Sequence, residues 1–174
     1  GSTLMNPVRR LPLETEHRES GATFQEYGGW LRPAYYGSKE RPIGIAREAR
    51  QARETVALFD GTPLGKIEVI GPDAAAFMDF VYYNTMSTLK PGRCRYGFIL
   101  SESGIVYDDG VLVRLEEDRF IVSCSSSHVT GVHALLEEWR QDQFDKKRIF
   151  IHNATAETAT LTVTGPLSKA LLAE

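Results

Sequence analysis

Two different apolar periodicities follow each other within residues 66–82, and this change limits the possible folds more than any other feature of the sequence. Residues 66–70 alternate apolar and polar side chains, which is typical of a strand with one buried face. From Ala74 to Tyr82 the apolar residues recur at the three- and four-residue spacing of an amphipathic helix. Gly71 and Pro72 separate the two patterns, and Pro is favoured in the first turn of a helix. The sequence therefore predicts a strand that leads directly into a packed helix.

A hairpin is predicted next. Residues 95–100 and 105–115 have strand character, and 101–104 form the turn, in which Gly104 supplies a positive φ. A third strand over 120–123 follows after a short connection. Antiparallel strands joined by such short connections predict a meandering sheet.

Helices and further strands complete the pattern. Ser125 to Ser127 are expected to cap a helix. Residues 44–57 predict an earlier helix, and strands are expected near 148–151 and 158–164. The predicted fold class is α+β, with helices packed on a largely antiparallel sheet. The apolar stripe of the helix after Ser127 is Val129, Val132, Leu136 and Trp139.

The chain is predicted to divide into three parts. Residues 1–42 are expected to be an irregular segment that wraps over a core or lines a ligand, because 26–37 are rich in Gly, Pro and aromatic side chains. A first subdomain is expected over 43–156. A second, truncated subdomain is expected over 157–174, since Gly165-Pro166 repeats the strand–Gly-Pro–helix pattern and the chain stops within that helix. The repeat is either a true internal echo or a chance recurrence of common residues.

Composition excludes several classes of function. The 174 residues carry a formal net charge of −3, whereas nucleic-acid binders usually carry a positive excess or a basic stripe. The sequence has no apolar run long enough to span a membrane and no secretory signal pattern. Cys94 and Cys124 have neither CxxC spacing nor a disulfide framework, so both are expected to be reduced, buried thiols in a cytoplasmic protein.

An aspartate pair in the second hairpin strand is the main candidate for chemistry. Strict alternation places Asp109 on one face with Val111, Val113 and Leu115, so Asp109 is predicted to face the core. A buried carboxylate must be hydrogen-bonded or paired, and it can act as a base or orient a cation. Either Asp109 has that role, or its carboxylate is satisfied structurally, by a turn or by an arginine such as Arg93 or Arg95.

Other constellations are weaker. The four histidines show no metal-ligand spacing, and nucleophile-elbow, P-loop and dinucleotide-binding motifs are absent. Residues 123–128, Ser-Cys-Ser-Ser-Ser-His, are compatible with a nucleophile but favour a strand end that leads into a helix cap. Tyr96 either offers its ring to a planar ligand or packs within the fold.

Several segments resemble the aminomethyltransferase (glycine-cleavage T-protein) family. The matching segments are 57–69, 70–74, 92–97 and 104–111. Within that family the chain is most similar to the C-terminal folate-binding domain of the sarcosine oxidase alpha subunit, through Gly29-Trp30, Arg32-Pro33, 90–97 and 108–111. The resemblance extends from about residue 10 to 174. It implies a second subdomain beyond residue 174 that carries the family's pterin-anchoring acidic residue.

The resemblance also implies site residues. The family's key carboxylate, which lies near the folate N10 nitrogen, falls on Asp109, and its ring-packing tyrosine falls on Tyr96. A family methionine falls on Leu64 and a family tyrosine on Val113, so these contacts with the ligand are altered while the apolar character is kept.

The function implied by the resemblance is tetrahydrofolate-dependent one-carbon transfer. In a sarcosine oxidase-like enzyme, the oxidised N-methyl carbon of an amine is captured as 5,10-methylenetetrahydrofolate, and flavin and NAD belong to partner domains or flavin-containing oxidase subunits. The alternatives are a glycine-cleavage aminomethyltransferase and a non-catalytic folate-binding or assembly module. The resemblance implies folate as ligand and neither nucleic acid nor membrane as a partner.

Overall fold

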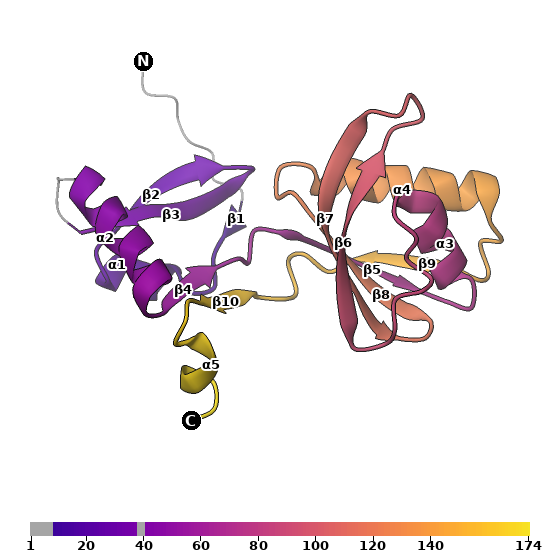
Figure 1. Cartoon of the computed structure of the whole chain (residues 1–174). Coiled ribbons are helices and arrows are strands. Elements are labelled where there is room, and N and C mark those ends of the chain that lie inside the picture. Colours follow the sequence, from indigo (N-terminus) through magenta and orange to yellow (C-terminus); the bar gives the residue numbers. More distant parts are fainter. Residues whose placement is uncertain (1–8, 38–40) are drawn as a thin grey trace, which may run out of the picture. The chain divides into compact units, whose positions relative to one another are not determined.

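The computed structural model describes residues 9–37 and 41–174, which form two compact units. Unit 1 comprises the described residues up to Pro63 together with Ala159–Glu174, and unit 2 comprises Leu64–Thr158. Both units combine helices and strands (Figure 1), so the α+β prediction is confirmed. No helix in the described part of the chain is long and apolar enough to cross a membrane.

Unit 2 is built on a five-stranded antiparallel sheet. Its strand order is β6-β7-β8-β5-β9, with hairpin connections between β6 and β7 and between β7 and β8. The predicted strands over 66–70, 95–100, 105–115 and 120–123 are all present. The bounds are β5 Gly65–Ile70, β6 Arg93–Leu100, β7 Val106–Glu116, β8 Arg119–Cys124 and β9 Phe150–Asn153.

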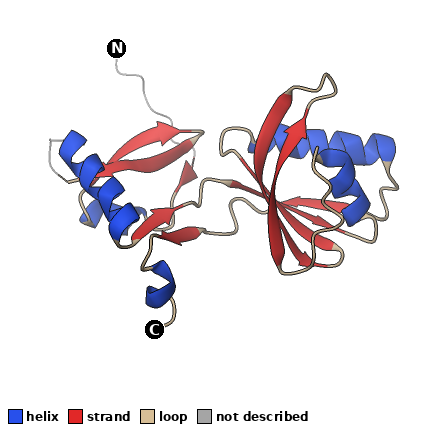
Figure 2. Cartoon of the chain, viewed as in Figure 1, coloured by secondary structure: helices blue, strands red, loops and turns tan. Residues whose placement is uncertain are grey.

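Two helices cover one face of this sheet (Figure 2), α3 over Ala74–Val81 and α4 over Val129–Gln143. The predicted stripes of both helices are buried and meet alternate residues of the strands in a single core. Since α3 and α4 are the two helices of unit 2 and both pack on this face, no helix of this unit covers the other face of the sheet. The core residues of the strands are Ile67, Val69, Ile99, Leu112, Phe120, Val122 and Cys124.

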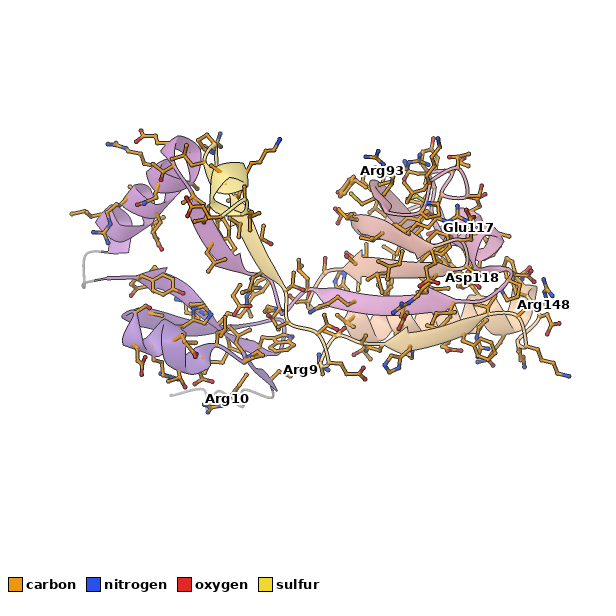
Figure 3. The ribbon with its side chains drawn as sticks, turned by 90° about the horizontal axis from the view of Figure 1, so that it is seen from below. Arg9, Arg10, Arg93, Glu117, Asp118 and Arg148 are labelled. Atoms are coloured by element: carbon orange, nitrogen blue, oxygen red, sulfur yellow. The ribbon has the colours of Figure 1, made fainter. Side chains whose placement is uncertain are left out.

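The entry to α3 is fixed by charge. Arg148, labelled in Figure 3, donates from Nε and Nη2 to the two carboxylate oxygens of Asp73, at 2.7 and 2.8 Å. Asp73 is the N-cap residue of α3, but its side chain makes no capping hydrogen bond. The bidentate pair with Arg148 lowers the pKa of Asp73. Arg148 belongs to the short basic run 146–148 of the sequence, so part of that run anchors the helix.

Unit 1 corrects the prediction of an irregular segment for the described part of residues 1–42, while residues 1–8 and 38–40 of that prediction lie outside the described residues. Its described part contains a three-stranded sheet of order β1-β3-β2, a separate antiparallel pair of strands β4 and β10, and three helices. The bounds are β1 Arg9–Arg10, α1 Glu14–Glu19, β2 Ala22–Tyr27, β3 Trp30–Tyr36, α2 Arg41–Glu54, β4 Ala57–Asp60, β10 Leu161–Thr164 and α5 Ser168–Leu171.

The hairpin of β2 and β3 explains why the prediction was wrong. Gly28 and Gly29 have φ of 61° and 80°, the backbone of a two-residue turn that only glycine adopts readily. Pro33 does not break β3, because it pairs with Phe24 at the point where the register shifts. Prolines are tolerated in sheets at such irregularities. The glycines and the proline that argued against a regular strand are thus the residues that form the turn and the register shift of this hairpin.

The two Gly-Pro steps have the same local structure. Gly71 and Gly165 both have positive φ, at 140° and 110°, and each lies before a helix, α3 or α5. A Cβ at Gly71 would collide with the backbone carbonyl of Arg148, and a Cβ at Gly165 would collide with that of Thr55. The second subdomain predicted from residue 157 nevertheless stays a prediction. In this structure β10 pairs with β4 within unit 1, and the limits of the two units do not coincide with the predicted boundaries after residues 42 and 156.

Candidate functional site

Asp109 and Tyr96 meet on the open face of the β6–β7 hairpin. Tyr96 lies opposite Val111 in the antiparallel register, and Asp109 lies opposite Phe98, so the two side chains are diagonal neighbours on one face. The Tyr96 hydroxyl donates a hydrogen bond to Oδ2 of Asp109. That bond raises the pKa of the Tyr96 phenol, since ionisation would place two negative oxygens side by side. The structure thus brings together the two polar residues that the resemblance selects.

Apolar side chains surround this pair. The rings of Tyr96 and Phe98 are edge-to-face, with centroids 5.5 Å apart, and Tyr96 is 52% exposed. Val111 and Val113 follow Asp109 on the same face at steps of two residues, and both remain at least partly exposed. An accessible carboxylate in an aromatic and aliphatic surface can hold a flat ligand that carries a hydrogen-bond donor or a positive charge.

The prediction that Asp109 faces the core is wrong, because the row of β7 side chains that contains Asp109 lies on the open face of the sheet. Asp108 is the buried aspartate, with 2% of its side chain exposed. It shares the core face with Leu112 and Arg114, while the apolar row that begins at Val111 is on the open face. Strict alternation was correct about which residues share a face, but the more apolar row is not the buried one.

Two charged side chains can occupy the core face because their hydrogen bonds are satisfied. Asp108 accepts from the backbone N–H of Ser125 at 2.9 Å and from its hydroxyl at 2.7 Å. Arg114 donates to the backbone carbonyls of Ser87, Leu89 and Glu117. No sequence pattern pointed to these structural roles, although adjacent aspartates in one strand necessarily point to opposite faces.

Neither Arg93 nor Arg95 pairs with the Asp109 carboxylate, so the alternative that one of these arginines satisfies it is wrong. Arg95 pairs with Leu112 on the core face of the hairpin and donates to the Thr85 carbonyl and the Thr88 hydroxyl. Arg93 pairs with Arg114 and therefore also lies in the core-facing row. Among the described residues, the side-chain hydrogen bond of Asp109 comes from Tyr96, which leaves carboxylate lone pairs available to a ligand.

Leu64 is not on this hairpin. It is half exposed and lies directly before β5, and β8 separates β5 from β7 in the sheet. The structure therefore places Tyr96, Asp109 and Val113 on one surface of the hairpin, and a role for Leu64 at the site stays a prediction.

Two of the possible nucleophiles in the segment 123–128, Ser125 and Cys124, are not activated. The Ser125 hydroxyl is committed to Asp108, and burial, followed by the charge of Asp108, raises the pKa of Cys124 to about 12. His128 is the N-cap residue of α4 and its side chain makes no capping hydrogen bond, so the expected serine cap is wrong. The expectation that both thiols are buried is also wrong for Cys94, which is exposed, whereas Cys124 is buried; both are free thiols.

Comparison with known proteins assigns the chain to a family. The family described as the GCVT N-terminal domain matches residues 13–174. The chain belongs to this family. Sarcosine oxidase subunit alpha from Corynebacterium sp. (strain P-1) is 37% identical over 173 residues, which cover 98% of this chain and 18% of that protein. Aminomethyltransferase from Streptomyces coelicolor is 37% identical over 166 residues, which cover 95% of this chain and 42% of that protein.

A solved structure supports the same conclusion for the fold. The crystal structure of glycine cleavage system aminomethyltransferase T from Bartonella henselae superimposes with a TM-score of 0.80 at 30% identity, over 95% of this chain and 43% of that one. The chain therefore spans less than half the length of these relatives. The resemblance to the aminomethyltransferase family and to the sarcosine oxidase alpha subunit, noted from the sequence, is confirmed.

Proposed function

We propose that this chain is the folate-binding part of a one-carbon transfer enzyme and that the open face of the β6–β7 hairpin holds tetrahydrofolate. The observation that carries the proposal is the accessible Asp109 carboxylate, held by Tyr96 within an apolar surface. Family membership supports it, because relatives at 37% identity are an aminomethyltransferase and a sarcosine oxidase subunit.

The residues of this face fit such a ligand. The rings of Tyr96 and Phe98 and the side chain of Val111 offer an apolar surface to a flat heterocycle. Asp109 supplies acceptor oxygens beside it, and the hydrogen bond from Tyr96 fixes the carboxylate in place.

The reaction that we propose is capture of a carbon at the formaldehyde oxidation level, the oxidised N-methyl group of an amine, as 5,10-methylenetetrahydrofolate. When bound, tetrahydrofolate supplies the nitrogen nucleophile. Asp109 favours positive charge next to it electrostatically, and its free lone pairs accept an N–H hydrogen bond that orients the nitrogen. The apolar side chains around Asp109 exclude water from part of the surface and strengthen this attraction. Flavin and NAD chemistry, in this proposal, belongs to parts of the enzyme other than these residues.

Glycine-cleavage aminomethyltransferase activity is the second candidate, because the Streptomyces aminomethyltransferase is as similar in sequence as the sarcosine oxidase subunit. The source of the transferred carbon distinguishes these two candidate activities. Formaldehyde production from an N-methyl amine by co-purifying flavin subunits supports the first candidate, and transfer from an aminomethyl-lipoyl carrier supports the second. A folate-binding chain that does neither would be a non-catalytic module.

Titration calorimetry with tetrahydrofolate tests the binding step. We expect the unmodified chain to bind and Tyr96→Phe and Asp109→Asn to bind about tenfold more weakly, the loss of one charge-assisted hydrogen bond. Asp118→Asn is the matched control, because Asp118 (Figure 3) is an exposed aspartate in the turn after β7. Absence of binding to the unmodified chain and to any longer protein that includes it would rule out the folate proposal.

A further inference from the structure

A cavity of about 310 Å³ lies entirely within unit 1, whereas the Asp109 surface belongs to unit 2. Its walls come from α1, β3, α2, β4 and β10. Its lining includes five titratable side chains that the proposed function does not use, and three of these contact one another, His17, Tyr36 and Asp60; the other two are Glu16 and Glu48. Leu58 and Leu161 supply apolar wall.

These three side chains form a continuous hydrogen-bonded chain. The Tyr36 hydroxyl lies 2.6 Å from Nδ1 of His17, and Nε2 of His17 lies 2.8 Å from Oδ2 of Asp60. Asp60 is the deepest member, with 2% of its side chain exposed, against 14% for His17. The remaining Asp60 oxygen accepts from the backbone N–H of Thr62 at 3.1 Å.

The direction of each hydrogen bond follows from the state of Asp60. Burial acts to raise the pKa of Asp60, but the hydrogen bonds from His17 and Thr62 outweigh burial and lower it. An ionised Asp60 can only accept, so Nε2 of His17 carries a proton. In a neutral imidazole Nδ1 is then the bare nitrogen, and it accepts the Tyr36 hydroxyl proton. The Tyr36 oxygen keeps lone pairs for a molecule in the cavity.

This is the arrangement of a nucleophile, a base and an orienting carboxylate. Burial, followed by the negative charges of Glu48 and Asp60, raises the pKa of Tyr36. The phenol is therefore protonated at neutral pH, and it becomes a strong nucleophile only if a base removes the proton as a bond forms. His17 is placed to do this, and Asp60 holds its ring in the required tautomer.

We propose that Tyr36 is a base-activated nucleophile that accepts a small acyl group from a neutral activated ester bound in this cavity. The Tyr36 Oη–carbonyl carbon bond forms and the bond from that carbon to the leaving oxygen breaks. The phenol proton passes to Nδ1 of His17 and from there to the leaving oxygen, so the histidine returns to its neutral state. Leu58 and Leu161 suit a short alkyl chain, and the nearby Glu16 and Glu48 disfavour an anionic ester.

The probe for this proposal is p-nitrophenyl acetate, added to the full chain at neutral pH. Peptide mapping by mass spectrometry then gives the acetylation rate of each tyrosine. General-base assistance contributes about 100-fold or more, so Tyr36 should react about 100-fold faster than Tyr83. Tyr83 is the internal control, because it is 76% exposed and would react first if access alone decided the rate. A Tyr36 rate equal to or below that of Tyr83 would overturn the proposal.

Variants identify the base. His17→Gln keeps a side chain that can hydrogen-bond but cannot accept the proton, and it should lower the Tyr36 rate about 100-fold while Tyr83 is unchanged. Glu19→Gln, an exposed position of the same helix α1, should leave both rates unchanged. A folded His17→Gln protein with the original Tyr36 rate would contradict the role of His17. If circular dichroism shows that this variant does not fold, the comparison of Tyr36 with Tyr83 in the unmodified chain decides the question alone.

Discussion

At the scale of single residues, two adjacent aspartates have opposite tasks. Asp108 points into the core, where it is clamped by Ser125 at the entry to α4. Asp109 points to the open face, where Tyr96 holds it and a ligand can reach it. Because strand residues alternate in direction, fixing the first aspartate also fixes where the second one points.

Substitution of each aspartate by asparagine should affect the free energy of unfolding differently. Asp108→Asn replaces a charged acceptor by an amide beside the Ser125 N–H and hydroxyl, so it should lower the free energy of unfolding by about 2 kcal/mol. Asp109→Asn should change it by less than about 0.5 kcal/mol, as exposed substitutions usually do. Urea unfolding of both variants measures the difference. Equal losses would contradict the assignment of the two faces.

The pKa of the Tyr96 phenol depends on its hydrogen bond with Asp109. The hydrogen bond to Asp109 raises the pKa of Tyr96, so Asp109→Asn should lower that pKa towards the ordinary tyrosine value. The ultraviolet absorbance of tyrosinate, titrated with pH, measures this. Subtraction of the Tyr96→Phe titration isolates the contribution of Tyr96 from that of the other tyrosines. An unchanged Tyr96 titration in Asp109→Asn would show that the two side chains do not pair in solution.

At the scale of elements, Asp79 in α3 supports the back of the candidate site. Its Oδ1 accepts from the backbone N–H groups of Met86 and Ser87, at 2.6 and 2.7 Å. The loop held in this way places Asn84, whose side-chain oxygen accepts the Phe98 N–H of β6 at 3.1 Å. The pKa of Asp79 is lowered, because these hydrogen bonds outweigh the effect of burial.

The contribution of Asp79 to stability should depend on pH. A carboxyl group whose pKa is lowered by folding stabilises the protein above its unfolded pKa, about 4, and loses this effect as the pH falls through the folded value. Asp79→Asn should therefore cost about 1 kcal/mol at neutral pH, and the difference from the unmodified chain should shrink in acid. Unfolding free energies across that range measure it. A difference that grows in acid would contradict the sign of the shift.

Elements with one dominant pattern were predictable from the sequence, and those shaped by exceptions were not. The stripe of α4 was predicted residue by residue, because four spaced apolar residues leave one possible buried face. The β2–β3 hairpin was missed although Gly28-Gly29 is a strong turn signal, since Pro33 argues against a strand unless the register shift is known. The face of β7 could not be predicted, because Arg114 and Asp108 are buried through partners that are distant in sequence.

At the scale of the whole molecule, the two units differ in how much apolar surface they bury. The hydrophobic core cluster lies in unit 2, where both helices seal one face of the sheet. In the described part of unit 1 the buried apolar side chains are few, namely Leu11, Trp30 and Leu31, and α2 exposes Ile43 and Ile45. Regions with few buried contacts open more readily than a packed core.

Hydrogen–deuterium exchange should therefore show two levels of protection in the full chain. We expect amides of β5, β7 and β8 to exchange much more slowly than those of β2, β3 and α2, because opening the core of unit 2 requires exposing far more apolar surface.

Leu136→Ala removes a fully buried side chain of α4 and should cost about 2–5 kcal/mol. It should accelerate exchange in unit 2 and leave unit 1 unchanged, whereas Leu31→Ala should do the reverse. If either substitution accelerates exchange equally in both units, the chain unfolds as one cooperative body, and the difference in buried surface does not set the order of opening.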